Sequence, residues 1–233
     1  MTTHDPGPFT YRWARPALTV DVTVFGLMES RLAVLLVQRG LEPFAGWWAL
    51  PGGFVEMAEG LEDAARRELA EEADVRPASM EQIGAFGTPD RDPRDRVVSV
   101  AFWALVRPDK HRPTAGTDAS AAAWHPIERL PPLAFDHSEI LDAGLGRLRA
   151  RAWSDGVGAE LLDEPFTLAE LQTAYEALFQ KPLDKRNFRR RMLELGVLRD
   201  TGAQRLAGRH RPAQLYQLDR ARVAARGPSL DLL

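Results

Sequence analysis

The 233-residue sequence contains no cysteine, which excludes disulfide bonds, a thiolate nucleophile and a cysteine-ligated zinc site. The absence also fits a cytoplasmic protein. The sequence has no apolar run long enough to span a membrane, and residues 1–11 lack the basic and then apolar pattern of a secretory signal. We therefore expect a cytoplasmic protein that does not associate with membranes.

A strong excess of either charge is also missing, because the formal net charge is only −3. The chain as a whole is therefore not a general binder of polyanions. Its composition, 45% hydrophobic and 27% charged, is typical of a globular protein, and its length suffices for two domains. The charge is unevenly distributed, however, because residues 181–226 contain thirteen Lys and Arg against four Asp and Glu.

Residues 52–75 combine a Gly-Gly turn with a helical segment rich in glutamate. At 100° per residue, Glu68 and Glu72 share one stripe with Ala64 and Leu69, the side expected to face the core. An ordinary charged helix would instead place its acids opposite the apolar stripe. Because buried unpaired carboxylates are costly, the two glutamates need a cation, and oxygen ligands beside a phosphate suit Mg²⁺ or Mn²⁺.

The same segment resembles the Nudix box, a pattern of glycine, arginine and glutamates at fixed spacing. The matching residues are Gly53, Glu59, Arg67, Glu68, Leu69, Glu71, Glu72 and Val75. One position departs from the pattern, because Asp74 stands where the family has glycine. That glycine would end the helix in a left-handed conformation, which aspartate tolerates, so the difference concerns the helix end more than the metal site.

The resemblance implies a divalent metal site and cleavage of a nucleoside diphosphate linked to another group, with water as the nucleophile. The implied metal ligands are Glu68, Glu72, the auxiliary Glu71 and the carbonyl of Gly52. Arg67 would orient Glu71 or Glu68, so Glu68, Glu71 and Arg67 are the candidate catalytic residues. The general base stays open, and its candidates are Glu68, Glu71, Asp118 and Asp136.

Residues 12–152 form the first predicted domain, which we expect to be an α/β/α sandwich with a mixed sheet, as in Nudix proteins. Alternating apolar and polar residues predict a half-buried strand over 18–24, and a continuous apolar run predicts a more buried strand over 31–39. The remaining expected strands span 47–50, 80–87, 97–106 and 123–126, and the expected helices span 61–75 and 138–150.

Two stretches of this domain, Asp90–Arg94 and Leu133–His137, resemble those of Nudix proteins that bind ADP-ribose. The predicted ligand-binding residues are Arg39, Arg91, Arg94, Phe135 and Asp136, and the arginines would contact phosphate bidentately. The alternatives are an ordinary solvated loop for 90–94 and a simple helix cap for Asp136. The nearby aromatic residues Phe44, Trp47, Trp48 and Phe86 are, taken singly, more typical of a core than of adenine stacking.

Residues 151–164 carry Gly, Ser and Asp and predict a linker, which leads into a second domain over 160–226. A Thr-x-x-Glu capping box at 167–170 begins one helix, and Asp184 can cap a second helix over 185–195. Two short strands on either side of a basic loop follow. The order predicts a winged helix-turn-helix domain.

The basic residues of this domain predict a DNA-binding surface, because neutralised phosphates release counterions and the start of the second helix can enter the major groove. The candidate DNA-binding residues are Lys185, Arg186, Asn187, Arg189, Arg190, Arg205, Arg209, His210 and Arg211. The alternative is a small helical interaction domain with an ordinary solvated face.

Together the two halves resemble the NrtR family of Nudix-related transcriptional regulators over nearly the whole chain. In the C-terminal half, residues 182–190 and 208–216 are similar to the family's recognition helix and wing. The resemblance implies a homodimeric repressor of NAD metabolism genes that binds a palindromic operator on double-stranded DNA and senses ADP-ribose or a related nucleotide. The hypotheses are regulation alone, hydrolysis of ADP-ribose to AMP and ribose 5-phosphate, or both.

Overall fold

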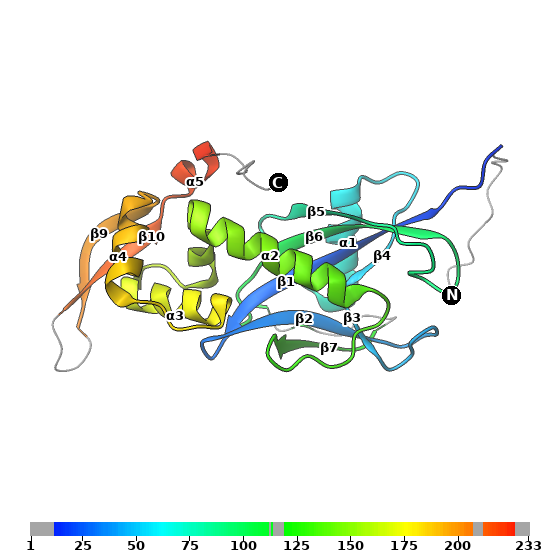
Figure 1. Cartoon of the computed structure of the whole chain (residues 1–233), viewed down its shortest axis with the longest axis horizontal. Coiled ribbons are helices and arrows are strands. Elements are labelled where there is room, and N and C mark those ends of the chain that lie inside the picture. Colours follow the sequence, from blue (N-terminus) through cyan, green and yellow to red (C-terminus); the bar gives the residue numbers. More distant parts are fainter. Residues whose placement is uncertain (1–11, 112, 114–118, 207–211, 227–233) are drawn as a thin grey trace.

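The computed structural model describes residues 12–111, 113, 119–206 and 212–226, and the elements are arranged as in Figure 1. The elements of the N-terminal part are β1 (Ala17–Met28), β2 (Arg31–Arg39), β3 (Trp48–Ala49), β4 (Gly52–Phe54), α1 (Leu61–Ala73), β5 (Glu81–Phe86), β6 (Val97–Leu105), β7 (Ala119–Pro126) and α2 (His137–Asp155). Those of the C-terminal part are the 3-10 helix η1 (Val157–Leu161), β8 (Phe166–Thr167), α3 (Leu168–Phe179), α4 (Lys185–Glu194), β9 (Leu198–Arg205), β10 (Ala213–Leu218) and α5 (Arg220–Arg226).

The N-terminal sheet is mixed, as predicted. Its strands follow the order β3-β2-β1-β6-β5, with β4 paired to β1 and β7 paired to β2. The central strands β1 and β6 run parallel over the register Ala17↔Val97 to Phe25↔Leu105, and the other pairs are antiparallel. Gly52 and Gly53, predicted as a turn, instead belong to the short strand β4, which pairs with β1 at the centre of the sheet.

Strand β1 is buried along most of its length, which corrects the expectation of a half-buried strand. Its valines pack with Ala64 and Leu69 of α1 in one core cluster. On the other face, Thr23 donates a hydrogen bond to the carbonyl oxygen of Phe102 at 3.2 Å and lies against Gly144 of α2, where a Cβ would approach the hydroxyl oxygen to 2.4 Å. Helices therefore cover both faces of the sheet, and the polar alternates of β1 are buried beneath α2 (Figure 1).

The segment predicted as a linker is instead a buried part of the fold. Helix α2 runs on to Asp155, and η1 follows after Gly156, whose φ is 77°. Val157, Ala159 and Leu161 of η1 are at most 5% exposed and belong to a core cluster with residues from both predicted domains. The expected boundary between 152 and 160 therefore falls inside a continuous core.

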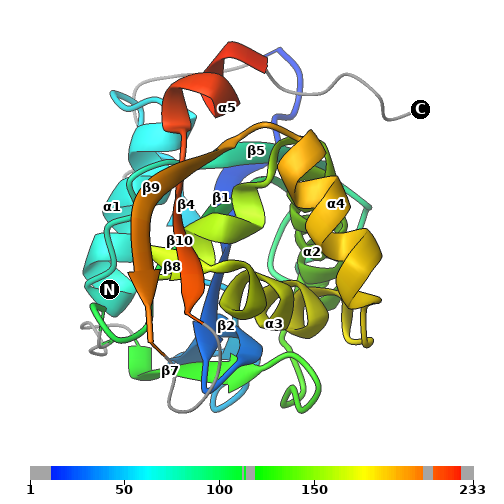
Figure 2. The same ribbon diagram turned by 90° about the vertical axis from the view of Figure 1, so that its left-hand side faces the viewer.

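The C-terminal part is a winged helix, in which the three-stranded sheet β8-β10-β9 lies beside α3 and α4 (Figure 2). Strand β8 was not predicted. The capping box is confirmed, because Thr167 accepts from the backbone nitrogen of Glu170 at 3.2 Å and Glu170 accepts from the backbone nitrogen of Thr167 at 2.7 Å. Asp184 caps α4 by accepting from the backbone nitrogen of Asn187 at 2.8 Å, and Gly196 follows the helix with a φ of 66°. Among the described helices, none has both the length and the apolar character of a membrane span.

Candidate functional site

The inward face of α1 carries the two glutamates that the helical wheel placed there. Glu68 is 9% exposed and lies beside the buried Ala64, Ala65 and Leu69. Glu72 accepts a hydrogen bond from the backbone nitrogen of Gly52 at 3.0 Å. The helix ends at Asp74 in the left-handed conformation, with a φ of 51°, so aspartate replaces the glycine of the Nudix box without changing the helix end.

Other atoms approach Gly52 and Gly53 closely, so a side chain at either position would meet a neighbouring group. A Cβ on Gly52 would lie 2.1 Å from the carbonyl oxygen of Val20, and a Cβ on Gly53 would lie 2.3 Å from Oε1 of Glu68. Strand β4 thus brings Gly52 so close to the backbone of β1 that no larger residue fits there, and it places Gly53 against the carboxylate of Glu68.

Arg67 connects the acids of the Nudix box. Its guanidinium contacts Glu59 at 2.7 Å, Glu68 at 2.7 Å and Glu71 at 3.3 Å, and it donates to the carbonyl oxygen of Phe54 at 3.0 Å. The predicted orientation of Glu68 and Glu71 by Arg67 therefore agrees with these contacts. Glu59, for which the sequence suggested no role, fixes the arginine from the other side, and these acids raise the pKa of Arg67.

The two inward carboxylates are electrostatically unfavourable without a cation. Burial, together with the neighbouring Glu68 and Asp21, raises the pKa of Glu72 to about 8, although the hydrogen bond from the backbone nitrogen of Gly52 opposes this shift. Burial also raises the pKa of Glu68, against the opposing effect of Arg67. A divalent cation would relieve both penalties, so the donor set of Glu68 and Glu72 fits Mg²⁺ or Mn²⁺.

Glu71 fits a metal site less closely than the other two glutamates. Its side chain is 62% exposed and its carboxylate contacts Arg67. Within the described part of the chain, no group of three or more His, Asp or Glu side chains is arranged to hold a metal ion. Its assignment as an auxiliary ligand, and that of the Gly52 carbonyl, therefore stay predictions.

A buried polar cluster that the sequence analysis missed adjoins this site. Asp21 of β1 accepts a hydrogen bond from Ser99 at 2.5 Å and lies 3.4 Å from both the guanidinium of Arg91 and Nε2 of His137. Arg91 donates to both carboxylate oxygens of Asp136, at 2.8 and 2.6 Å. One signal was available in the sequence, because a charged residue such as Asp21 in the middle of an apolar strand needs buried partners.

These contacts rule out the simplest structural roles for Arg91 and Asp136, two of the predicted ligand-binding residues. The side chain of Arg91 is 4% exposed and is held by carboxylates, so the simple solvated loop is wrong for this residue. Asp136 stands at the N-cap position of α2 without a side-chain cap, because its carboxylate binds Arg91 instead. The simple helix cap is therefore also wrong, and direct ligand contact by either residue stays a prediction.

The other three predicted ligand-binding residues lie together. The guanidinium of Arg39 lies 4.8 Å from the ring centre of Phe135, and that of Arg94 lies 5.7 Å from the same ring. Burial and the nearby Arg94 lower the pKa of Arg39. Arg94 is paired with Asp92 at 2.6 Å, whereas Arg39 donates to the carbonyl oxygens of Pro43 and Leu41. The guanidinium groups of Arg39 and Arg94 create positive potential beside α1.

The neighbouring aromatic residues are not simply core. Phe44 contacts Phe135 and Trp47 edge to face, with ring centres 4.9 and 5.5 Å apart. Trp47 is 44% exposed, which differs from the expectation of a core residue. Trp48 is half-buried and packs edge to face on His125, as a core residue would.

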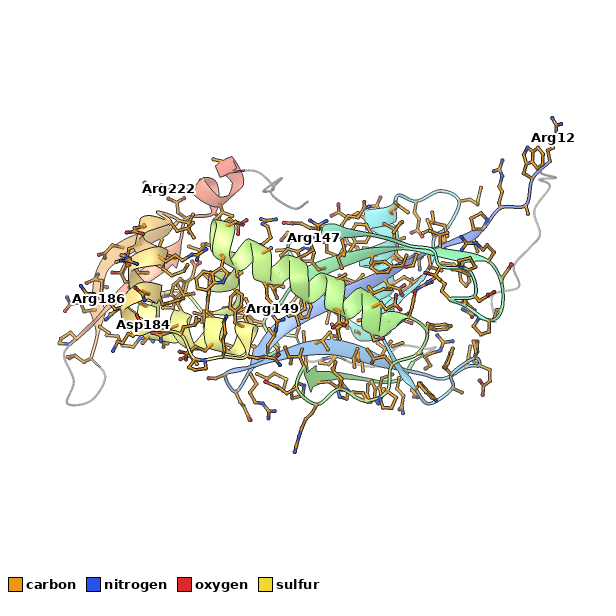
Figure 3. All side chains as sticks on the ribbon, viewed as in Figure 1. Arg12, Arg147, Arg149, Asp184, Arg186 and Arg222 are labelled. Atoms are coloured by element: carbon orange, nitrogen blue, oxygen red, sulfur yellow. The ribbon has the colours of Figure 1, made fainter. Side chains whose placement is uncertain are left out.

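A second surface lies on α4, at the opposite end of the molecule (Figure 3). Phe188 and Met192 are buried, and the predicted DNA-binding residues of the helix are exposed: Lys185, Arg186, Asn187, Arg189 and Arg190. Arg190 donates to the side-chain oxygen of Asn187 at 3.3 Å. Across the residues that the structure describes, no carboxylate pairs with these four cations, so their charge is available to a polyanion.

Among the predicted DNA-binding residues of the wing, the structure describes Arg205, which already has partners within the protein. Arg205 of β9 lies on this part of the fold, but its guanidinium contacts Glu170 of α3 at 2.5 Å and donates to the carbonyl oxygen of Pro165 at 2.8 Å. The predicted DNA-binding residues Arg209, His210 and Arg211 lie outside the described residues, as does the candidate base Asp118.

Comparison with known proteins relates both halves of the chain to known families. Residues 17–144 match the NUDIX domain, and residues 158–218 match the NrtR DNA-binding winged helix domain. The chain is 35% identical over 206 residues to the "ADPR responsive transcriptional repressor NtrR" of Acinetobacter baylyi, covering 87% of this chain and 82% of that protein. It is 40% identical over 129 residues to the "ADP-ribose pyrophosphatase" of Methanocaldococcus jannaschii, covering 55% of this chain and 73% of that protein.

Solved structures of Shewanella oneidensis NrtR are also similar. The complex with a 27mer DNA has a TM-score of 0.77 and 39% identity, and the match covers 89% of this chain and 95% of that one. Its NUDIX domain complexed with ADP ribose has a TM-score of 0.55 and 36% identity, covering 58% and 90% of the two chains. The chain therefore belongs to the NrtR family, with a NUDIX domain followed by a DNA-binding winged helix.

Proposed function

We propose that the protein is a transcriptional regulator whose DNA binding responds to ADP-ribose or a related nucleotide. The observation that carries this proposal is that one fold combines a cluster of paired charges at the Nudix box with a recognition helix whose outward cations have no carboxylate partners among the described residues. The family relatives that respond to ADPR and that bind DNA and ADP ribose support it.

In the Nudix domain, Arg39 and Arg94 would bind the diphosphate, because guanidinium groups match phosphate oxygens in geometry and charge. Glu68 and Glu72, with the Gly52 carbonyl, would hold Mg²⁺ or Mn²⁺, which supplies positive charge for the same diphosphate. Arg67 holds Glu68 in place by its contact at 2.7 Å.

In the winged helix, Arg186, Arg189 and Arg190 would contact the major groove and the flanking phosphates. A homodimer would place two such helices on a palindromic operator. Genes of NAD metabolism are the proposed targets, and repression is the proposed effect, as in the relative from Acinetobacter baylyi named a repressor.

Regulation requires that ADP-ribose binds the DNA-free state more tightly than the DNA-bound state. We expect saturating ADP-ribose to weaken DNA affinity about tenfold or more, within the usual range of allosteric coupling. The measurement is fluorescence anisotropy with a duplex that the protein selects from a random-sequence pool, with and without ADP-ribose and Mg²⁺.

The matched controls are AMP and ribose 5-phosphate, the two halves of the ligand, which should leave DNA affinity unchanged at the same concentrations. Equal DNA affinity at zero and at saturating ADP-ribose would contradict the proposal.

A second candidate function is hydrolysis of ADP-ribose to AMP and ribose 5-phosphate, which would remove the signal. It is favoured by the intact Glu68 and Glu72 and by the resemblance to the ADP-ribose pyrophosphatase from Methanocaldococcus jannaschii. A carboxylate would accept a proton from the attacking water, and the water oxygen would bond to phosphorus as the bridging P–O bond breaks.

The test is product analysis of ADP-ribose incubated with the protein and Mg²⁺. Hydrolysis predicts stoichiometric AMP and ribose 5-phosphate, and loss of turnover in Glu72→Gln. Intact ADP-ribose after prolonged incubation with wild-type protein would leave regulation as the only function of the site.

A further inference from the structure

Helix α2 joins the two functional regions directly. Its first residue is His137. Nδ1 of His137 accepts a hydrogen bond at 2.9 Å from the backbone nitrogen of Leu50, which lies just before β4. Nε2 of the same ring lies 3.4 Å from Asp21, which pairs in register with Gly52 on β4. The N-terminal end of α2 is therefore fixed to Leu50 and to β1, beside the strand β4 whose Gly52 contacts Glu72.

The other end of α2 is fixed to the winged helix. Nε of Arg149 donates to the carbonyl oxygen of Leu178 at the end of α3, at 3.0 Å. The hydroxyl of Tyr175 donates to the carbonyl oxygen of Ala152 at 2.6 Å, inside the core. Arg149 and Ala152 follow His137 by 12 and 15 residues, so at about 1.5 Å of rise per residue α2 carries these two sets of contacts roughly 18 to 23 Å apart.

Trp153 of α2 reaches the recognition helix. Its ring stacks on Phe179 with centres 5.0 Å apart and meets Phe188 of α4 edge to face at 6.3 Å. The guanidinium of Arg191, also on α4, lies 4.3 Å from the centre of the Trp153 ring. Arg191 thus differs from Arg189 and Arg190, because its guanidinium faces the Trp153 ring of α2 instead of solvent alone.

The junction between the two regions leaves little room for independent motion. A Cβ on Gly158 would lie 2.8 Å from the ring of Tyr175, and a Cβ on Gly156 would lie 2.8 Å from Cγ2 of Val197. Close-packed junctions transmit displacement because side chains cannot deform continuously. A shift of α2 at the nucleotide site would therefore be transmitted to its contacts with the winged helix, which include the Trp153–Arg191 contact.

We propose that Trp153 and Arg191 are positioning residues that set the orientation of the recognition helix according to the state of the nucleotide site, with α2 as the rigid connection. The inference rests on the proposed ligand-responsive regulation. Neither residue contacts the nucleotide, and the cation–π contact selects one orientation of α4 relative to α2.

The test is the coupling factor, the ratio of DNA dissociation constants with and without saturating ADP-ribose, measured with the selected duplex. Arg191→Gln and Trp153→Leu should each reduce the coupling factor about two- to fivefold, the range expected for loss of one cation–π contact. Arg191→Lys and Trp153→Phe, which keep a cation or a ring, should retain most of the coupling. ADP-ribose affinity in the absence of DNA should stay at the wild-type value.

Arg190→Gln is the matched control, because Arg190 is the adjacent exposed arginine of the same helix. It should weaken DNA binding equally in both ligand states and leave the coupling factor unchanged. Arg191 lies on the surface, so Arg191→Gln still tests the proposal if Trp153→Leu does not fold. A wild-type coupling factor of one contradicts the proposed function itself, whereas full coupling in Arg191→Gln overturns only the role of this contact.

Discussion

Helices α1 and α4 both carry dense charge, but they use it in opposite ways. On α1 the carboxylates of Glu68 and Glu72 face inward and are held by Arg67 and the backbone of Gly52. On α4 the cations of Lys185, Arg186, Arg189 and Arg190 face outward, and Arg190 donates to the side chain of Asn187.

The difference separates a site for a small ligand from a surface for a long one. Buried charges with fixed partners hold a defined geometry, which positioning a metal and a diphosphate requires. Exposed cations without carboxylate partners remain free to neutralise phosphates spaced along a duplex. Four variants test this contrast and the structure around it, beginning with the largest expected effect.

Reversing the charge of the outward face should affect DNA binding most. In Arg186→Glu with Arg190→Glu, we expect a loss of about 100-fold or more in DNA affinity and a weaker dependence on salt, because two phosphate contacts become repulsive. Fluorescence anisotropy over a series of salt concentrations measures both. ADP-ribose affinity, measured by calorimetry, should not change, and a parallel loss would show that the two regions do not function separately.

Removing the bridging cation of the inward face should weaken the nucleotide site without changing DNA affinity. In Arg67→Gln, Glu68 and Glu71 lose a shared partner, and we expect a loss of about 10- to 100-fold in Mg²⁺-dependent ADP-ribose affinity. The neighbouring Arg66 pairs with Glu62 on the outer side of α1, at 2.7 Å, and provides the control. If Arg66→Gln reduced the ADP-ribose affinity as much as Arg67→Gln, the loss in Arg67→Gln could not be attributed to the contacts of Arg67 with Glu68 and Glu71.

The buried cluster next to the site predicts a dependence of stability on pH. Burial lowers the pKa of His137, so the unfolded chain binds a proton more readily than the folded protein below about pH 6.5. The stabilising contribution is therefore complete above that pH and declines as the pH falls. Between pH 6.5 and 5.5 we expect His137 to cost about 1 kcal/mol of unfolding free energy.

Urea unfolding of wild-type protein and of His137→Gln at both pH values measures the effect, and the difference between the two proteins removes the contribution of other titrating groups. The same pH dependence in both proteins would mean that His137 does not titrate as its burial requires.

The smallest effect is expected at Arg205, a cation of the winged helix that already has a partner. Because its guanidinium is paired with Glu170, Arg205→Gln should lower DNA affinity less than about threefold, below the effect of Arg190→Gln. A loss equal to that of Arg190→Gln would show that pairing within the protein does not decide which cations bind DNA.

Local patterns predicted much of this structure. The wheel placed Glu68 and Glu72 inward, the Thr167–Glu170 box and Asp184 marked the starts of α3 and α4, and the Nudix box located the two glycines that approach β1 and α1. Each of these features is encoded within a few consecutive residues.

Contacts between distant segments could not be read in the same way. The burial of Thr23 depends on Gly144 of α2, and the pair between Arg91 and Asp136 joins residues 45 positions apart. The supposed linker is rich in turn-forming residues because glycine is needed for close packing at 156 and 158, not because the chain is exposed there. Composition alone does not distinguish these two uses of glycine.

The central claim is that the nucleotide site and the DNA-binding surface are energetically coupled, and the affinity of ADP-ribose for DNA-saturated protein tests it most directly. Linkage requires that the duplex weaken ADP-ribose binding by the same factor as ADP-ribose weakens DNA binding, about tenfold or more. Calorimetric titration of ADP-ribose into free protein and into protein saturated with the selected duplex gives that factor. The same dissociation constant in both titrations would contradict the account.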